Sequence, residues 1–184
     1  RERIAGARSL LVQLEIRPEV AAAAARIARA AGGRVIVNPA PAPASAAAVA
    51  PLLALADVVA PNETEAALLT GLAAVDAASA PEAARRLEAA GARAVVITLG
   101  ASGAFVSDGE HQEHVPAFVV ESVDSTAAGD AFCGALAAAW RPGVSLSRAV
   151  RWASAAGALA CTRLGAEPSL PLRPAIDALA AQGT

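Results

Sequence analysis

Short apolar runs and alanine-rich amphipathic runs alternate along this chain, and they predict strands and helices in turn. Arg8–Glu15 (RSLLVQLE) is an apolar run that ends in polar residues, as a buried parallel strand does. A helix is predicted from Pro18 to the glycines at 32 and 33, and Arg34–Asn38 (RVIVN) is the next strand. The prolines of the following PAPAPAS remove backbone donors, so no regular element is expected there.

The same alternation continues to the end of the chain. The further elements expected are a weak helix over 46–55, a very short strand over 57–60, helices over 61–71 and 81–91, a clear strand over 94–100 (AVVITLG), a strand pair around the Asp108–Gly109 turn, a helix opening near Asp130, a long helix over 145–164 and a closing helix over 173–181. Such an order predicts an α/β fold, a parallel sheet covered by helices, with ligands outside the carboxyl ends of the strands.

Composition narrows the class of protein. A chain of 184 residues can bury one substantial core, so residues 1–184 are expected to belong to a single domain. A net charge of -2, the lack of a basic run and few aromatic residues argue against a nucleic-acid partner and against binding to an anionic membrane surface. No apolar run reaches the ~20 residues of a membrane span. Cys133 and Cys161 are expected to be buried thiols of a cytoplasmic protein.

Two absences are informative. All 15 basic residues are arginine, which excludes a Walker lysine, a Schiff-base lysine and a kinase-type lysine. The chain has no methionine and opens on Arg1 within a pattern, so it is expected to be a fragment of a longer protein.

The stretch Val123–Trp140 (VDSTAAGDAFCGALAAAW) carries the strongest chemical pattern. Ser125 and Thr126 are expected to cap a helix through their hydroxyls. The small residues that follow would let a ligand approach their backbone amides, which with the helix dipole form a site for an anion such as phosphate. Asp130 would then place a carboxylate beside that anion, as phosphoryl transfer to an alcohol requires. The alternative is an ordinary capped helix with Asp130 as a dipole-stabilising acid.

Two other segments have both a structural and a functional interpretation. Asn62 and Glu65 in PNETEAALLTG either form a capping box or reach a metal ion beside nucleotide phosphates. The turn LGASGAF either binds a nucleotide or only joins two strands, and it is not a G-x-G-x-x-G fingerprint. His111 and His114 have no third ligand nearby and are predicted to be surface residues.

A loop near the carboxyl terminus offers hard oxygen donors. TRLGAEPSLP, over 162–171, has backbone carbonyls and the Ser169 hydroxyl, which suit a monovalent cation. As a bare pattern it is a helix-ending glycine followed by a proline stop.

The order of these motifs is more specific than any one of them. QLE, NPAPA, PNETEAALLTG, VVITLGASGAF, VDSTAAGDAF and TRLGAEPSLP occur in succession, and the chain resembles the ribokinases of the PfkB-like sugar kinase family over essentially all 184 residues. The resemblance implies an α/β three-layer sandwich and the reaction of ATP with D-ribose to give ribose 5-phosphate and ADP. It places this chain in the C-terminal, nucleotide-binding and catalytic portion, without the N-terminal portion and the β-sheet lid.

The resemblance also implies roles for individual residues. Asp130 would be the catalytic base, and Glu15 would contact the sugar. The anion hole would consist of the residues Ala127, Ala128 and Gly129. Magnesium and the ATP phosphates would be bound near Asn62 and Glu65, and ATP also near Thr98, Gly100, Ala101, Ser102 and Gly103. An activating potassium ion would be surrounded by Asp124, Thr126, Ala160, Arg163, Gly165 and Ser169.

Departures from the family pattern qualify these roles. Ser154 stands where ribokinases can carry a histidine near the adenine, and Asp124–Ser125–Thr126 replaces the commoner D-T-x. With most sugar contacts absent, the isolated chain is expected to be inactive and monomeric or aggregating, and the parent protein to dimerise through the missing lid. A kinase for another sugar and a nucleotide-binding fragment without turnover stay open, whereas a Rossmann-type oxidoreductase lacks its glycine fingerprint.

Overall fold

The computed structural model describes residues 1–182 and is built on a six-stranded sheet. The strands lie in the order β1-β2-β3-β4-β5-β6, and β1 to β4 are parallel, whereas β5 and β6 are antiparallel to their neighbours. Their bounds are β1 Ser9–Val12, β2 Arg34–Val37, β3 Val58–Val59, β4 Val95–Thr98, β5 Ala104–Ser107 and β6 Gln112–Val115. The predicted mainly parallel sheet is therefore confirmed.

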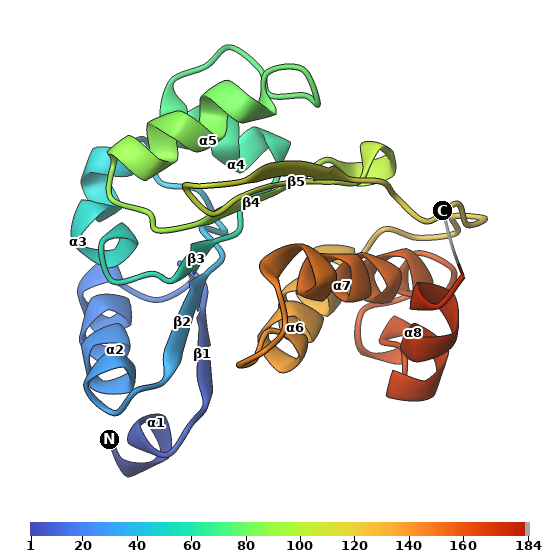
Figure 1. Cartoon of the computed structure of the whole chain (residues 1–184), viewed down its shortest axis with the longest axis horizontal. Helices are drawn as coiled ribbons and strands as arrows, with labels where there is room; N and C mark the ends of the chain where they lie inside the picture. Colours follow the sequence, from blue (N-terminus) through green and yellow to red (C-terminus); the bar gives the residue numbers. More distant parts are fainter. Residues whose placement is uncertain (183–184) are drawn as a thin grey trace.

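Helices cover both faces of the sheet, which makes three layers (Figure 1). One face packs against α2 Pro18–Ala30, α3 Ala50–Leu53, α4 Glu63–Thr70 and α5 Ala80–Ala89. The other packs against α6 Ala128–Ala139, α7 Leu146–Ala160 and α8 Arg173–Ala180. A single turn, α1 Glu2–Ala5, precedes the sheet and was not predicted. Each face has its own apolar core because the side chains of a strand alternate between the two faces.

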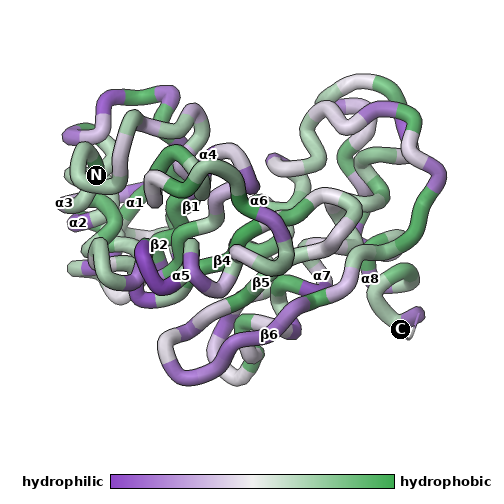
Figure 2. Tube along the Cα trace, turned by 90° about the horizontal axis from the view of Figure 1, so that it is seen from above, coloured by the Kyte–Doolittle hydropathy of each residue, from purple (hydrophilic) through white to green (hydrophobic). Residues whose placement is uncertain are grey.

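The strand at one edge of the sheet is polar. β6 exposes Gln112, Glu113 and His114 and buries only Val115, and Figure 2 shows it as a hydrophilic segment beside hydrophobic β5. A polar edge strand resists pairing with other chains.

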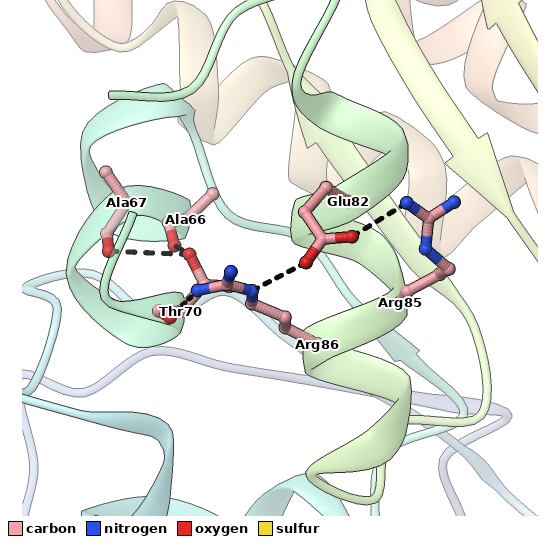
Figure 3. Close-up of polar contacts among 6 residues, drawn as sticks. All are labelled: Ala66, Ala67, Thr70, Glu82, Arg85 and Arg86. Carbon is pink, nitrogen blue, oxygen red and sulfur yellow. Dashed lines mark hydrogen bonds and ion pairs between the residues drawn. The ribbon is translucent and has the colours of Figure 1, made fainter. Parts of the chain in front are cut away.

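Arg86 joins α5 to the carboxyl end of α4, and further contacts lie within each helix (Figure 3). Arg86 of α5 donates a hydrogen bond of 3.1 Å to the carbonyl oxygen of Thr70, at the carboxyl end of α4. The same arginine pairs with Glu82 at 2.9 Å, and the Thr70 hydroxyl donates to the Ala66 carbonyl at 2.6 Å. These contacts support the helix whose first turn carries Asn62 and Glu65.

Several predicted boundaries are corrected. The weak helix over 46–55 is a 3₁₀ turn, Ala46–Val49, followed by the single turn α3. The long helix expected over 145–164 is α7, which ends at Ala160. The hydroxyl cap predicted for α6 is wrong: the helix begins after Ala127, and no side chain caps it. The Asp124 carboxylate accepts the Thr126 amide, and Ser125 contributes only its carbonyl oxygen, to the amide of Ala128.

Candidate active site

A cavity of about 450 Å³ lies at the carboxyl ends of the parallel strands. Its position follows from the sheet, because chain segments leaving parallel strands all emerge at the same edge. The residues that line it are Gln13, Glu15, Asn38, Ala40, Ala60, Asn62, Glu65, Thr98, Ala127, Gly129, Asp130 and Cys133. Seven of them were predicted as site residues: Glu15, Asn62, Glu65, Thr98, Ala127, Gly129 and Asp130.

Two amides connect the two central carboxylates of the cavity. The Gln13 Nε2 donates to Asp130 Oδ1 at 2.9 Å and to Asn38 Oδ1 at 3.0 Å. The Asn38 Nδ2 in turn donates to the Ala60 carbonyl at 2.9 Å and approaches Glu65 Oε2 at 3.5 Å. Residues that directly follow β1 and β2 are thereby joined to residues of α4 and α6 by polar contacts.

The first turn of α4 is closed by a capping box. The Asn62 Oδ1 accepts the Glu65 amide at 2.8 Å, and Glu65 Oε2 accepts the Asn62 amide at 2.9 Å. The Glu65 side chain also faces the cavity, although the residue is only 9 % exposed. Burial raises the pKa of Glu65 above its usual value, the hydrogen bond from the Asn62 amide opposes that rise, and the charge of Glu63 adds to it. The capping interpretation is thus confirmed, and among the described residues no donor contacts Glu65 Oε1.

The amino-terminal end of α6 presents open backbone amides. Ala127 has a left-handed conformation, with φ of 60°, which costs an alanine ~1–2 kcal/mol. Among residues 1–182 the amides of Gly129 and Asp130 have no hydrogen-bond acceptor, whereas the amide of Ala128 donates to the Ser125 carbonyl at 3.2 Å. A Cβ at Gly129 would meet no atom within 4 Å. Open amides, a strained turn and free space together fit a phosphate group.

The turn after β4 lies partly outside the cavity. Thr98 lines it, while Gly100, Ala101 and Ser102 form an exposed 3₁₀ turn beside α4. The hairpin interpretation of this turn is confirmed, since Gly103 leads directly into β5. Ser154 lies half-buried on α7 and does not line the cavity.

Two segments, residues 123–126 and residues 160–169, meet where the cation site was predicted. The amides of Val123 and Asp124 donate to the Cys161 carbonyl at 2.8 and 3.1 Å, and the Gly165 amide donates to Asp124 Oδ2 at 2.9 Å. Thr126, through its hydroxyl and its amide, and the Gly165 amide hold the pKa of Asp124 below its usual range. The Asp124 carboxylate is therefore an anion at neutral pH.

The other residues predicted to surround the cation, Ala160, Arg163 and Ser169, lie in the segment over residues 160–169. The buried Ser169 hydroxyl donates to the Ala166 carbonyl at 2.7 Å, and the Arg163 amide approaches the Ala160 carbonyl at 3.4 Å. A carboxylate, a hydroxyl and backbone carbonyls are the hard oxygen donors that an alkali cation prefers.

Other reactive side chains take no part in the cavity chemistry. Burial, together with the charges of Asp130 and Glu65, raises the pKa of Cys133 to about 12, so this thiol stays protonated. Cys161 is also a free thiol but is only half-buried, so the predicted burial is confirmed for Cys133 and is wrong for Cys161. Both histidines are exposed as predicted. Residues 1–182 contain no group of three or more His, Cys, Asp and Glu residues placed to hold a metal. No helix in this part of the chain has the length and hydrophobicity needed to cross a membrane.

Gln13 and Asn38 were not assigned roles from the sequence. Both belong to recognised motifs, QLE and NPAPA, and both directly follow a parallel strand. A polar side chain placed directly after a buried strand was the available signal, because that position faces the ligand edge of the sheet.

The chain belongs to the pfkB family of carbohydrate kinases, whose model matches residues 2–173. It is 41% identical over 170 residues to a ribokinase of Haemophilus influenzae, covering 92% of this chain and 55% of that protein. The chain thus spans about half the length of this curated relative.

Solved structures show the same fold. A ribokinase of Arabidopsis thaliana complexed with ribose and ATP matches with a TM-score of 0.90 and 29% identity, covering 99% of this chain and 58% of the other. Phosphofructokinase-2 of Escherichia coli in complex with potassium matches with a TM-score of 0.76 and 26% identity, covering 94% of this chain and 55% of the other.

Proposed function

We propose that the protein containing this chain transfers the γ-phosphoryl group of ATP to the primary 5-hydroxyl of D-ribose. The observation that carries the proposal is the placement of the Asp130 carboxylate beside the open amides of Gly129 and Asp130, in one cavity at the carboxyl ends of the parallel strands. A carboxylate can take a proton from an alcohol, and the amides can bind the phosphoryl group that the alcohol attacks.

In this reaction the bond between the sugar oxygen and phosphorus forms while the bond from phosphorus to the β-phosphate oxygen breaks. The hydroxyl proton passes to Asp130 as the oxygen bonds to phosphorus. The amides of Gly129 and Asp130 donate to the phosphoryl oxygens, where negative charge is spread in the transition state. Glu15, which lines the cavity and is exposed, is assigned to the sugar.

The remaining polar residues are assigned to ATP and to cations. Thr98 and the turn from Gly100 to Gly103 would hold the nucleotide. Asn62 and Glu65 would hold Mg²⁺ or its water ligands, and the segments around Asp124 and Ser169 would hold K⁺; these cations would neutralise phosphate charge. The raised pKa of Glu65 supports this, because a buried carboxylate that has no basic partner among residues 1–182 gains most from a cation.

The comparisons support a sugar kinase and do not single out ribose for this chain. Glu15 and Asp130 are its two candidate sugar contacts, so a kinase of another sugar is the nearest alternative. A nucleotide-binding protein without turnover is a second alternative. The Asp130 carboxylate argues against it, because binding alone does not require a carboxylate beside the phosphate site.

The test is an assay of ADP release by the full-length gene product that carries these 184 residues. We expect turnover that depends on D-ribose, rises with K⁺ and falls by ~10²-fold or more in Asp130→Asn, since general base catalysis contributes about that much. Unchanged turnover in Asp130→Asn contradicts the mechanism. Turnover with a different sugar only changes the substrate, and ATP binding without turnover on any sugar favours the binding protein.

A further inference from the structure

Gln13 donates a hydrogen bond to the candidate base, Asp130. Its Nε2 donates to Asp130 Oδ1 at 2.9 Å, across 117 positions of sequence, and to Asn38 Oδ1 at 3.0 Å. A side-chain amide nitrogen has two hydrogens, so these two bonds use its full donor capacity. Among residues 1–182 no other side chain or amide donates to the Asp130 carboxylate.

The other end of this contact is rigid. Gln13 directly follows β1, and Asn38 directly follows β2, which pairs with β1 in a regular parallel ladder. The Asn38 amide is fixed by its bond to the Ala60 carbonyl at 2.9 Å. Asp130, in contrast, is exposed on the first turn of α6, and within residues 1–182 its carboxylate accepts a side-chain hydrogen bond from Gln13 alone.

We infer that Gln13 is a positioning residue for Asp130, an inference that rests on the proposed function. Its amide orients the carboxylate by engaging one oxygen, which leaves the other oxygen for the sugar hydroxyl. The Gln13–Asn38 pair also joins the base to Glu65, so the two carboxylates of the cavity keep a set relation through two neutral amides. A small displacement of a catalytic group from its correct orientation can lower the rate by ~10²-fold.

The property of residue 13 that matters for this role is its ability to donate a hydrogen bond to Asp130. A leucine in its place would fill similar space and donate nothing. A glutamate would be nearly isosteric, but would put a second carboxylate against Asp130, where two negative charges repel and a shared proton is favoured. That proton would restore an O–H donor at lower pH.

The experiment measures kcat and KM of the full-length gene product for wild type, Gln13→Leu and Gln13→Glu. Gln112→Glu, on the exposed edge strand β6, is the matched control. We expect Gln13→Leu to lower kcat by about 10- to 100-fold with KM for ATP unchanged. We expect the kcat of Gln13→Glu to fall by a similar factor at pH 8, and its ratio to wild type to recover as the pH is lowered to 6. Gln112→Glu should follow wild type throughout.

The outcomes separate this inference from the proposed function. Wild type without turnover on any sugar refutes the proposed function, and the inference with it. Active wild type with unchanged kcat in both Gln13 variants refutes the inference alone. A Gln13→Glu defect that is the same at every pH also refutes it, since a purely structural defect does not depend on a proton at residue 13. If Gln13→Leu fails to fold, the pH dependence of the isosteric Gln13→Glu decides by itself.

Discussion

Gly129 occupies the point where α6 meets the cavity, and its missing side chain leaves space. A Cβ there would meet no atom within 4 Å, so the fold itself does not require glycine. We predict that Gly129→Ala leaves the melting temperature unchanged or slightly raised and lowers kcat/KM for ATP by about 10- to 100-fold, because the methyl group would occupy the phosphate space. Thermal unfolding and steady-state kinetics on the full-length gene product measure the two effects.

Gly134 provides the matched control on the same helix. It is also exposed, and a Cβ there would also meet nothing within 4 Å, but it does not line the cavity. Gly134→Ala should raise stability by ~0.5–1 kcal/mol through its better helix propensity and leave kinetics unchanged. Equal activity of the two variants would contradict a phosphate site at Gly129.

Glu65 should make stability depend on pH. Its pKa is raised in the folded state by burial, so the folded protein binds a proton more readily than the unfolded chain does. Between the unfolded value, 4.5, and the raised folded value, stability therefore falls as pH rises. We predict that Glu65→Gln, whose oxygen can still accept the Asn62 amide, gains stability relative to wild type as pH rises from 4 to 7. Urea unfolding at several pH values tests this prediction. A difference in unfolding free energy between the two proteins that does not change with pH would show that burial does not penalise the charge of Glu65.

The residues that could be predicted from the sequence are those whose roles are local. Asn62 and Glu65 were recognisable because a capping box is complete within four positions, and Asp130 because a first-turn acid follows small residues. The pairing of Gln13 with Asp130 could not be predicted, since nothing in either segment specifies a contact across 117 positions.

At the scale of elements, the turn between β4 and β5 depends on Gly103. Its φ is +91°, and a Cβ there would overlap the Val115 carbonyl oxygen of β6. We predict that Gly103→Ala costs at least ~3 kcal/mol, from left-handed strain and overlap with backbone that cannot yield. Gly109, in the next turn, has φ of +87° with nothing within 4 Å, so Gly109→Ala should cost only ~1 kcal/mol. Urea unfolding of both variants measures the difference, and equal losses would mean that strain alone acts at Gly103.

Elements with strong periodicity matched the predictions, and irregular ones did not. The strands and the helices α2 and α5 follow from an apolar pattern with proline and glycine boundaries, and α7 was predicted from its pattern but ends earlier than expected, at Ala160. The start of α6 was predicted wrongly because an alanine with positive φ has no sequence signal: serine and threonine beside it are usual caps. The turn is stabilised instead by Asp124 and the distant Gly165, a contact that no local rule contains.

At the scale of the whole molecule, the candidate nucleotide residues and the candidate sugar residues line one cavity. The alternation of strands and helices was enough to predict a parallel sheet with ligands at its carboxyl edge, and the cavity lies there. The order of the strands and the packing of α6 against β1 depend on tertiary contacts, which the pattern of single elements does not encode.

These candidate assignments predict how the 184-residue chain behaves by itself. Its candidate nucleotide contacts are Asn62, Glu65, Thr98 and Gly129, and its candidate sugar contacts are Glu15 and Asp130. We expect the chain to bind ATP with Mg²⁺ and not to turn over ribose. A ligand at about 100 times its Kd stabilises the folded state by ~2.7 kcal/mol, which for a protein of this size raises Tm by about 5–10 °C.

AMP, which lacks the β- and γ-phosphates, is the control and should shift Tm far less, because the open amides at α6 and the Glu65 carboxylate act on the distal phosphates. Equal shifts with AMP and ATP would place the affinity on the nucleoside and contradict the phosphate site, and a shift with ribose alone would mean that the sugar site is more complete in this chain than these two carboxylates imply.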